Sequence, residues 1–327
     1  MREALSDSYG RRIEYLRISV TDRCNFRCLY CMPAAGLEWL PKSGILSYEE
    51  IARVASELAP LGLRRLRITG GEPTLRPQLE RLIGMLRSIP EIEDISLSTN
   101  GVRLPELARS LKAAGLGRVN MSADSLRADR IREISRRNID FDPIAAATAA
   151  EEAGLSPIKL NVVVMRGIND DELCDFARLT LDREWHVRFI ELMPVGEMRD
   201  LTWDHVVPSA EVLQRVAAIA PLEQAVGPVL GNGPARYFRF SGARGTIGVI
   251  TPMSHTYCGS CNRVRLTADG RLRTCLFGDD EVDLRTPLRE GLPLEPFFRS
   301  ALVSKPKEHN LLQMRVGGLR ALSQVGG

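Results

Sequence analysis

The fold is decided by one stretch near the start of the chain, residues 15–31, which read YLRISVTDRCNFRCLYC. Leu16–Val20 is a short run rich in apolar and β-branched residues, which predicts a β-strand. Cys24, Cys28 and Cys31 follow this strand directly, in the pattern C-x3-C-x2-C. A loop that leaves a strand with three closely spaced cysteines points to a metal cluster held at the end of a sheet.

Outward from this stretch, strand-like and helix-like segments alternate over the first two-thirds of the chain. Further strand-like runs lie at 63–70, 94–99, 118–124, 158–165 and 186–193. Helix-like stretches lie at 47–61, 77–86, 104–115, 143–154 and 170–181. Six strand–helix repeats imply a parallel sheet with helices outside it. An open doubly wound sheet also fits, but motifs gathered after the strands favour a barrel. We therefore predict an α/β fold, an incomplete (β/α)6 TIM-like barrel, over residues 1–220.

The pattern changes after about residue 200. One more helix is expected at 208–220, followed by strand-like runs at 235–240, 246–251, 264–267 and 271–276. Asp269 and Gly270 form a dipeptide typical of a tight hairpin turn. We expect residues 221–327 to form a smaller, partly antiparallel C-terminal region that binds iron–sulfur and substrate.

Composition excludes several classes of function. The 327-residue chain has a net charge of +3 and is 44% apolar, which is ordinary for a globular protein. That charge is too small to indicate nucleic acid or a membrane surface as partner. No apolar run is long enough to cross a bilayer, and none resembles a signal peptide. We expect a soluble cytoplasmic protein, in which close cysteine groups indicate metal rather than disulfides.

The first cysteine triad fits a four-iron cluster with one iron left open. Three thiolates ligate three irons, so the fourth iron can bind the amino and carboxylate groups of S-adenosylmethionine. Tyr30 is placed to pack against the adenine. A zinc site or free buried cysteines are the alternatives, although zinc usually requires four protein ligands.

A second motif follows the next strand. Gly70 and Gly71 allow the backbone to approach a ligand closely. Glu72 can accept hydrogen bonds from an ammonium group. Alone, such a turn is a weak signal, but next to the cysteine loop in strand order it supports a binding site for S-adenosylmethionine.

The second triad consists of Cys258, Cys261 and Cys275, and it also leaves one iron open if it holds a cubane. A zinc knuckle completed by His255, or a purely structural cluster, remains an alternative. Arg263 and Arg265 follow at once, and strand alternation places both on one face. Two fixed cations beside a cluster suit a polyphosphate or a carboxylate.

These motifs together resemble the radical S-adenosylmethionine superfamily and, within it, the GTP 3′,8-cyclase family of molybdenum cofactor biosynthesis. The resemblance extends nearly end to end. It rests on 15–28, on Cys31-Met32-Pro33, on 67–73, on Asn161 and Val162, and on the second triad with its arginines and the Gly-Gly ending.

The resemblance implies a role for each matching residue. Two [4Fe–4S] clusters are implied, with the ligands Cys24, Cys28 and Cys31, and Cys258, Cys261 and Cys275. Implied contacts to S-adenosylmethionine come from Tyr30, Gly71, Glu72, Ser122 and Met193. Implied contacts to GTP come from Arg17, Arg67, Ser98, Lys159, Arg263, Val264 and Arg265. Catalytic roles are implied for Arg263, Arg265, Gly326 and Gly327, the two glycines belonging to a tail that reaches the active site.

The same resemblance implies a lyase reaction. A 5′-deoxyadenosyl radical removes hydrogen from C3′ of GTP, and the ribose radical then attacks C8 to give (8S)-3′,8-cyclo-7,8-dihydroguanosine 5′-triphosphate. A reductant protein and a downstream cyclic pyranopterin monophosphate synthase are the implied partners, and a homodimer is left open. The rival hypotheses are a radical peptide maturase with an auxiliary cluster and a zinc-stabilised binding protein.

Overall fold

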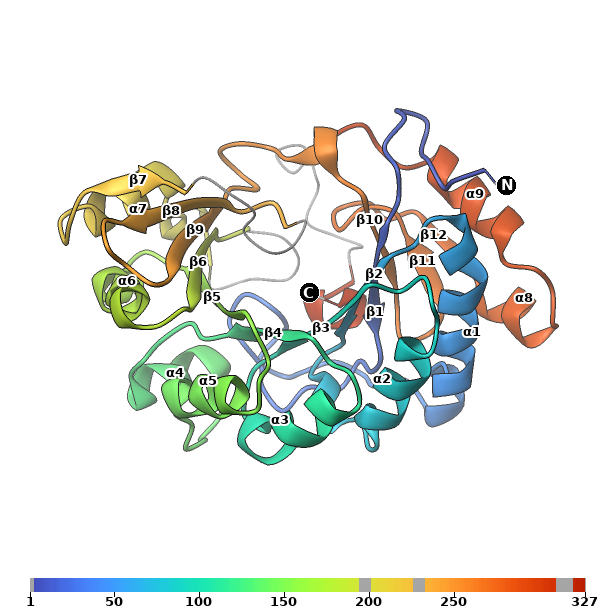
Figure 1. Cartoon of the computed structure of the whole chain (residues 1–327), viewed down its shortest axis with the longest axis horizontal. Helices are drawn as coiled ribbons and strands as arrows, with labels where there is room; N and C mark the ends of the chain where they lie inside the picture. The colour runs from blue at the N-terminus through green and yellow to red at the C-terminus, as the bar shows by residue number, and fades with distance from the viewer. Residues whose placement is uncertain (1–2, 194–200, 226–232, 310–319, 327) are drawn as a thin grey trace.

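The computed structural model describes residues 3–193, 201–225, 233–309 and 320–326. Six parallel strands form its centre: β1 Tyr15–Ser19, β2 Arg65–Thr69, β3 Asp94–Thr99, β4 Arg118–Ser122, β5 Ile158–Val164 and β6 His186–Glu191. They are hydrogen-bonded neighbours in chain order. Figure 1 shows that they curve around a central space rather than lying flat. The predicted incomplete (β/α)6 barrel is therefore confirmed.

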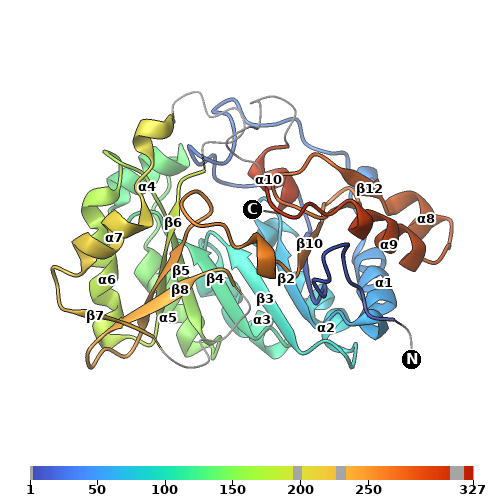
Figure 2. The same ribbon diagram turned by 90° about the horizontal axis from the view of Figure 1, so that it is seen from above.

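Helices cover the outer side of this curved sheet (Figures 1 and 2). They are α1 Tyr48–Leu58, α2 Leu79–Arg87, α3 Leu104–Ala113, α4 Ala128–Ser135, α5 Pro143–Glu152, α6 Leu173–Asp182 and α7 Ser209–Val216. The first begins at a capping box, in which Ser47 and Glu50 satisfy each other's backbone N–H groups. Helix α4 was not predicted from the sequence.

Strand alternation divides the barrel residues between two environments. In β1, Leu16 and Ile18 are fully buried in the apolar core, whereas Tyr15 and Arg17 line the central cavity. In β2, Leu66 and Ile68 likewise belong to the core. The outward positions of the strands are therefore apolar and pack under the helices, while polar side chains are gathered inside.

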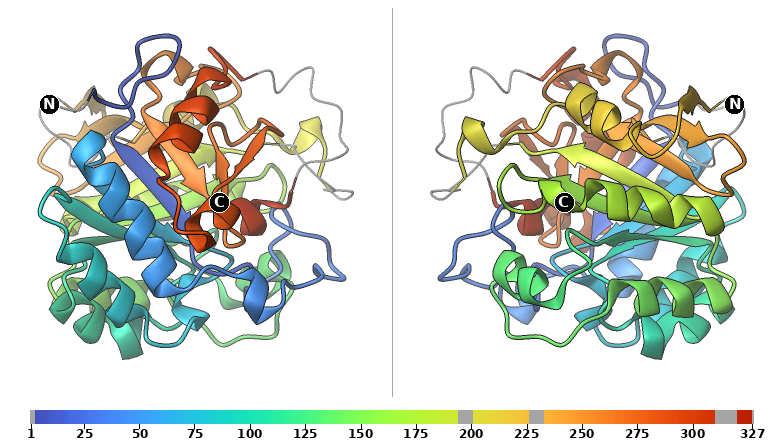
Figure 3. Two further views of the ribbon diagram at one scale, coloured as in Figure 1. Left: turned by 90° about the vertical axis from the view of Figure 1, so that its right-hand side faces the viewer. Right: turned by 90° about the vertical axis from the view of Figure 1, so that its left-hand side faces the viewer.

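The strands after residue 220 continue the same sheet at both of its ends. They are β7 Leu222–Gln224, β8 Arg236–Phe240, β9 Thr246–Ile250, β10 Arg263–Leu266, β11 Arg271–Arg273 and β12 Glu281–Asp283. β10 pairs in parallel with β1, and β9 pairs in parallel with β6. β11 and β12, and β7 and β8, complete antiparallel edges. Figure 3 shows β1 in blue beside the orange C-terminal strands.

The predicted C-terminal region is therefore partly antiparallel, as expected, but it is joined to the barrel by parallel pairing. Three further helices of this region follow β12: α8 Arg285–Arg289, α9 Glu295–Val303 and α10 Leu322–Val325. The last lies on the inner side of the sheet (Figure 2). β7, β12 and these three helices were not predicted. Within the described residues, no helix is long and apolar enough to span a membrane.

Substitution of Gly245, which directly precedes β9, tests how closely the chain packs there against the residues before β6. A Cβ at Gly245 would lie 2.2 Å from the carbonyl oxygen of Trp185 and 2.7 Å from that of Arg183, both backbone atoms. We expect Gly245→Ala to lower the free energy of unfolding by about 1–3 kcal/mol, because the backbone must move apart. Chemical denaturation measures this change.

The matched control is Gly84→Ala on the exposed face of α2, where an added Cβ meets nothing within 4 Å. This change should stabilise the protein by about 0.5–1 kcal/mol, because alanine favours the helix. Equal effects of the two substitutions would contradict the close packing of β9 on β6.

Candidate functional site

A cavity of about 300 Å³ lies inside the barrel. Its walls include the loops that follow β1, β2, β3 and β4, where the sequence motifs lie. Parallel strands bring these loops to one end of the sheet, which explains why motifs separated by up to a hundred residues meet.

The first cysteine triad forms one side of the cavity, since Cys24, Cys28 and Cys31 all line it. Its loop is tied to the end of α4, because Arg27 N donates to Ser135 O and Leu29 N donates to Ile134 O. Burial raises the pKa of Cys24 to about 12 and that of Cys31 to about 11. Thiols with such pKa values are protonated at neutral pH, so a metal must displace their protons.

His255, the ligand considered for a zinc knuckle, is exposed. Among the residues that the structure describes, no group of three His, Cys, Asp or Glu side chains is arranged to hold one metal ion. In a four-iron cluster each cysteine sulfur binds a different iron, so the three sulfurs need not converge on one point.

The Gly-Gly-Glu motif lies against the first cysteine loop. A Cβ at Gly71 would lie 2.3 Å from Arg23 O, so only glycine allows this approach. Glu72 is fully buried and accepts hydrogen bonds from Thr74 N, Thr74 Oγ1, Thr99 Oγ1 and Asn100 N. Glu72 thus joins the loops after β2 and β3, a bracing role that the sequence did not indicate.

Tyr30 makes a contact that sequence reasoning missed. Its hydroxyl donates to Asp124 Oδ2 at 2.7 Å, and Asp124 Oδ1 accepts from Val163 N at 2.9 Å. Burial raises the pKa of Asp124 to about 6, although the hydrogen bond from Tyr30 opposes this shift. Asp124 follows β4 by two residues, so a polar residue just past a barrel strand was the available signal.

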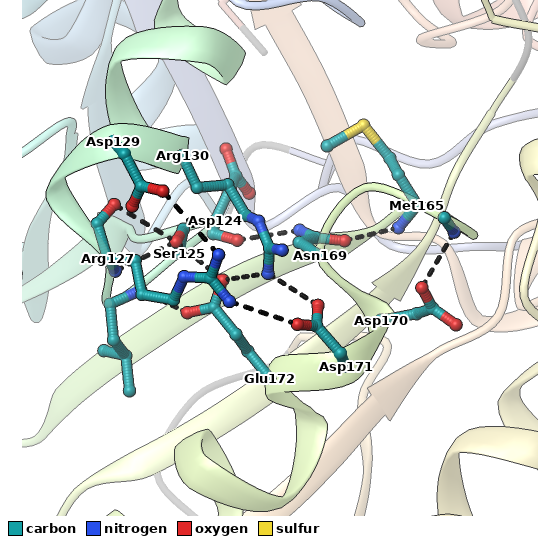
Figure 4. Close-up of polar contacts among 12 residues, drawn as sticks. Asp124, Ser125, Arg127, Asp129, Arg130, Met165, Asn169, Asp170, Asp171 and Glu172 are labelled. Carbon is teal, nitrogen blue, oxygen red and sulfur yellow. Dashed lines mark hydrogen bonds and ion pairs between the residues drawn. The ribbon is translucent and has the colours of Figure 1, made fainter.

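A network of hydrogen bonds and ion pairs holds the loop after β4 in place (Figure 4). The buried Glu172 accepts hydrogen bonds from Ser125 Oγ, Leu126 N and Arg130 Nη1, each at 2.7 Å. Asn169 donates to Asp124 O and to Val163 O. The loop after β4 is therefore fixed to the loop after β5, which positions Asp124 toward Tyr30.

The two remaining residues expected at S-adenosylmethionine also line the cavity. Ser122 ends β4 and is exposed to the cavity, and Met193 follows β6. The residues directly after Met193 lie outside the described part of the chain.

Five arginines among the described residues also line the cavity. Arg17, Arg67, Arg263 and Arg265 line it, and so does Arg188, which the sequence analysis missed. The strand register places Arg17 between Arg67 and Arg265, on neighbouring strands. The signal for Arg188 was a charged residue between the buried apolar residues Val187 and Phe189 of β6.

Burial and mutual repulsion weaken the protonation of these side chains. Burial, followed by Arg265 and Arg67, lowers the pKa of Arg17. Burial lowers the pKa of Arg67 and of Arg265 to about 10. Burial, followed by Arg188, lowers the pKa of Lys159 to about 6. The site would hold these groups as cations more readily with an anion present.

The other three expected substrate contacts differ in their access to the cavity. Ser98 lines the cavity. Lys159 is buried beside Arg188 and does not itself line the cavity. Val264 points into the apolar core between the two arginines, so only its backbone can face a ligand.

The second triad does not line the cavity itself, but its Cys261 lies beside Arg263, which does. Cys258, Cys261 and Cys275 are mutual electrostatic neighbours, and Tyr257 and Leu276, each adjacent to one of them, line the cavity. Burial acts to raise the pKa of Cys261, but Arg263 and Lys305 outweigh it and the pKa is lowered. The second triad thus lies in a more cationic environment than the first.

The C-terminal tail enters the cavity. Leu322 and Ser323 line it, and Arg265 Nη1 donates to Gly326 O at 2.7 Å. Gly326 has φ +73°, and a Cβ there would lie 2.2 Å from Thr69 Oγ1. Gly326 therefore fits against β2 only as glycine. Gly327 lies outside the described residues.

Comparisons with known proteins agree on one family. Residues 18–180 match the model of the Radical SAM superfamily, and residues 185–311 match that of Molybdenum Cofactor Synthesis C. A protein of Moorella thermoacetica called GTP 3′,8-cyclase is 48% identical over 99% of this chain and 100% of its own. A protein of the same name from Listeria welshimeri is 43% identical, over 99% of this chain and 100% of its own.

Solved structures share the fold at low identity. Streptococcus suis SuiB bound to S-adenosylmethionine superposes with a TM-score of 0.59 at 15% identity, covering 94% of this chain and 72% of its own. SuiB bound to the precursor peptide SuiA gives a TM-score of 0.61 at 12% identity, covering 95% of this chain and 76% of its own.

The bracing role of Glu72 can be tested directly. Glu72→Gln places an amide N–H where the carboxylate accepts from N–H or O–H groups, so one buried donor loses its acceptor. We expect a loss of about 1–3 kcal/mol in the free energy of unfolding, measured by denaturation. The control Glu49→Gln removes a carboxylate from an exposed ion pair with Arg81 and should cost less than about 1 kcal/mol. If Glu72→Gln instead leaves stability unchanged, Glu72 is not a brace.

Proposed function

The chain belongs to the GTP 3′,8-cyclase family of radical S-adenosylmethionine enzymes, and we propose that it converts GTP to (8S)-3′,8-cyclo-7,8-dihydroguanosine 5′-triphosphate for molybdenum cofactor biosynthesis. The observation that carries this proposal is the division of one cavity between a cysteine triad and a cluster of buried cations. The first side suits a radical-generating cofactor, and the second suits a triphosphate.

The first side would hold an iron–sulfur cluster and S-adenosylmethionine. When bound, they supply a 5′-deoxyadenosyl radical. Cys24, Cys28 and Cys31 would ligate the cluster. Gly71 would let the backbone approach S-adenosylmethionine, and Tyr30, held by Asp124, would border it. Ser122, Met193 and Glu72 line the same side and complete the proposed cofactor site.

The second side would bind GTP. Arg17, Arg67, Arg263 and Arg265, together with the added Arg188, would contact its phosphates, and the backbone at Val264 and the hydroxyl of Ser98 would add neutral contacts. Lys159 would add a positive charge behind them. The residues thereby hold the ribose toward the first triad and exclude water from the space between, which protects a radical from side reactions.

We further propose a second [4Fe–4S] cluster on Cys258, Cys261 and Cys275, with its open iron toward the guanine. The residues fit because Cys258 has Cys261 and Cys275 as electrostatic neighbours, and Cys261 lies beside Arg263, which lines the cavity. On this proposal residues 1–220 supply the radical and residues 221–327 supply the second cluster. Residue Gly326 would act from the tail, as would Gly327.

The proposed partners follow from the reaction. A reductant protein must supply an electron, and a cyclic pyranopterin monophosphate synthase would use the product. Two chains could associate as a homodimer. The alternative of a radical peptide maturase has less support, because the likeness to SuiB concerns the fold alone.

The decisive experiment is anaerobic reconstitution, followed by incubation with dithionite, S-adenosylmethionine and GTP. We expect about eight irons per chain and 5′-deoxyadenosine formation that requires GTP. Four irons would refute the second cluster. Formation of 5′-deoxyadenosine at the same rate without GTP, and no cyclic product, would refute the cyclase function.

Removal of two of the arginines that line the cavity should weaken the turnover of GTP. Arg263→Ala with Arg265→Ala should lower kcat/KM for GTP at least about a hundredfold, because each lost charged hydrogen bond is worth about 1.5–3 kcal/mol. Both clusters should keep their iron. Arg244→Ala, in an exposed ion pair with Glu184, is the control and should leave activity unchanged. Loss of iron in the double variant would make the two arginines structural.

The lowered pKa of Lys159 leads us to expect that the protein takes up a proton when GTP binds. Its pKa of about 6 lies below the ordinary 10.5, so the side chain is mostly neutral at pH 7.5 in the empty site. Phosphates nearby favour the charged form and raise this pKa. Calorimetry at pH 7.5 in buffers of different ionisation enthalpy should show that the protein takes up as much as about one proton more than Lys159→Met does. Equal uptake by both proteins would contradict the proposal that Lys159 gains a proton in response to the charge of the phosphates.

A further inference from the structure

Lys305 is a buried lysine behind the second cysteine triad, only 3% exposed. Its Nζ donates to Thr274 O at 2.6 Å, to Arg263 O at 3.0 Å and to Cys261 Sγ at 3.7 Å. An ammonium group has three N–H donors, and these three acceptors match that number. The side chain is therefore built into the structure as a cation directed at a cysteine sulfur.

The two carbonyl contacts connect Lys305 to both halves of the triad. Arg263 follows Cys261 by two residues, and Thr274 immediately precedes Cys275. One ammonium group thus holds together two segments that each carry a cysteine. The contact with the sulfur is set by this backbone frame, rather than by a flexible surface side chain that happens to lie nearby.

Arg11 ties the Lys305 segment to the third cysteine. Its Nη2 donates to Pro306 O at 2.7 Å, and its Nη1 donates to Lys307 O at 3.0 Å and to Cys258 O at 2.7 Å. Asp7 in turn accepts from Arg11 Nε. The N-terminal segment, the segment after α9 and all three cysteines are therefore parts of one hydrogen-bonded unit.

The first triad has no comparable lysine contact among the hydrogen bonds of the described residues. Its charged neighbours include the carboxylates Glu72 and Asp124, which raise the pKa values of Cys24 and Cys28 after the larger effect of burial. At Cys261, Arg263 and Lys305 act in the opposite direction. Carboxylates thus act on Cys24 and Cys28 of the first triad, whereas a lysine and an arginine act on Cys261 of the second.

We propose that Lys305 is a positioning residue for the second cluster, which fixes the Cys261 thiolate by an N–H···S hydrogen bond and raises the reduction potential of that cluster. This inference rests on the proposed function, because it requires the second cluster to exist. Hydrogen bonds to the sulfurs and the charge around a cluster set its potential. A reduced cluster carries one more negative charge, so a nearby cation stabilises the reduced form.

The test is an anaerobic redox titration of the full reconstituted chain, with each cluster followed by its electron paramagnetic resonance signal. The signal that changes on addition of GTP identifies the second cluster. In Lys305→Met this cluster should titrate at a more negative potential. We expect at least about a tenfold lower ratio of reduced to oxidised cluster at the wild-type midpoint, equivalent to about 59 mV for a one-electron couple.

Two further variants separate tuning from a merely structural role. Lys305→Arg keeps the charge and N–H donors and should restore the wild-type potential. Lys307→Met removes an exposed lysine two residues away and should leave it unchanged. If Lys305→Met loses iron, Lys305→Gln, which keeps a donor without the charge, is titrated in its place and should show a negative shift.

The failures are distinguishable by iron content. Wild-type protein with about four irons, or without a GTP-sensitive cluster signal, would overturn the proposed second cluster and the role of Lys305 together. Wild-type protein with both clusters, but with an unchanged potential in the neutral variant that retains its iron, would overturn only the role of Lys305.

Discussion

The structure depends on placing like charges side by side inside a barrel. The register of β10, β1 and β2 sets Arg265, Arg17 and Arg67 in one row across three neighbouring strands. Like charges directly opposite one another destabilise a sheet, and burial removes the water that would screen them. The apolar outer positions of the same strands, Leu16 and Leu66 among them, hold the row in place. A bound polyanion would relieve the repulsion, which links the stability of the barrel to occupation of its cavity.

The two cysteine triads have different charged neighbours. The first faces the carboxylates of Glu72 and Asp124 and is made of thiols whose pKa values are raised by burial. The second has Arg263 and Lys305 beside Cys261, whose pKa is lowered. One cavity therefore has an end suited to a cofactor with its own positive sulfonium charge and an end suited to phosphate. The ribose of a nucleotide bound at the second end would lie between them.

Much of this arrangement could be predicted from the sequence because its signals are local. The strand and helix periods and the two cysteine spacings each lie within 18 residues, the span from Cys258 to Cys275. What could not be predicted depends on pairing between distant segments. The parallel pairing of β10 with β1 joins Tyr15 to Arg263, and Lys305 reaches a cysteine 44 residues before it. Arg188 was missed because no sequence motif surrounds it, and its role is visible only once Asn120 and the cavity lie beside it.

The most direct measurement of the central claim compares ligands that share a guanine and differ in phosphate. Thermal unfolding of the anaerobically reconstituted protein would be followed with GTP, with guanosine and with inorganic triphosphate at equal concentrations. If the buried arginine row requires an anion, GTP raises the unfolding temperature most, triphosphate raises it as well, and guanosine has little effect. Stabilisation by guanosine equal to that by GTP, with none from triphosphate, would contradict the account.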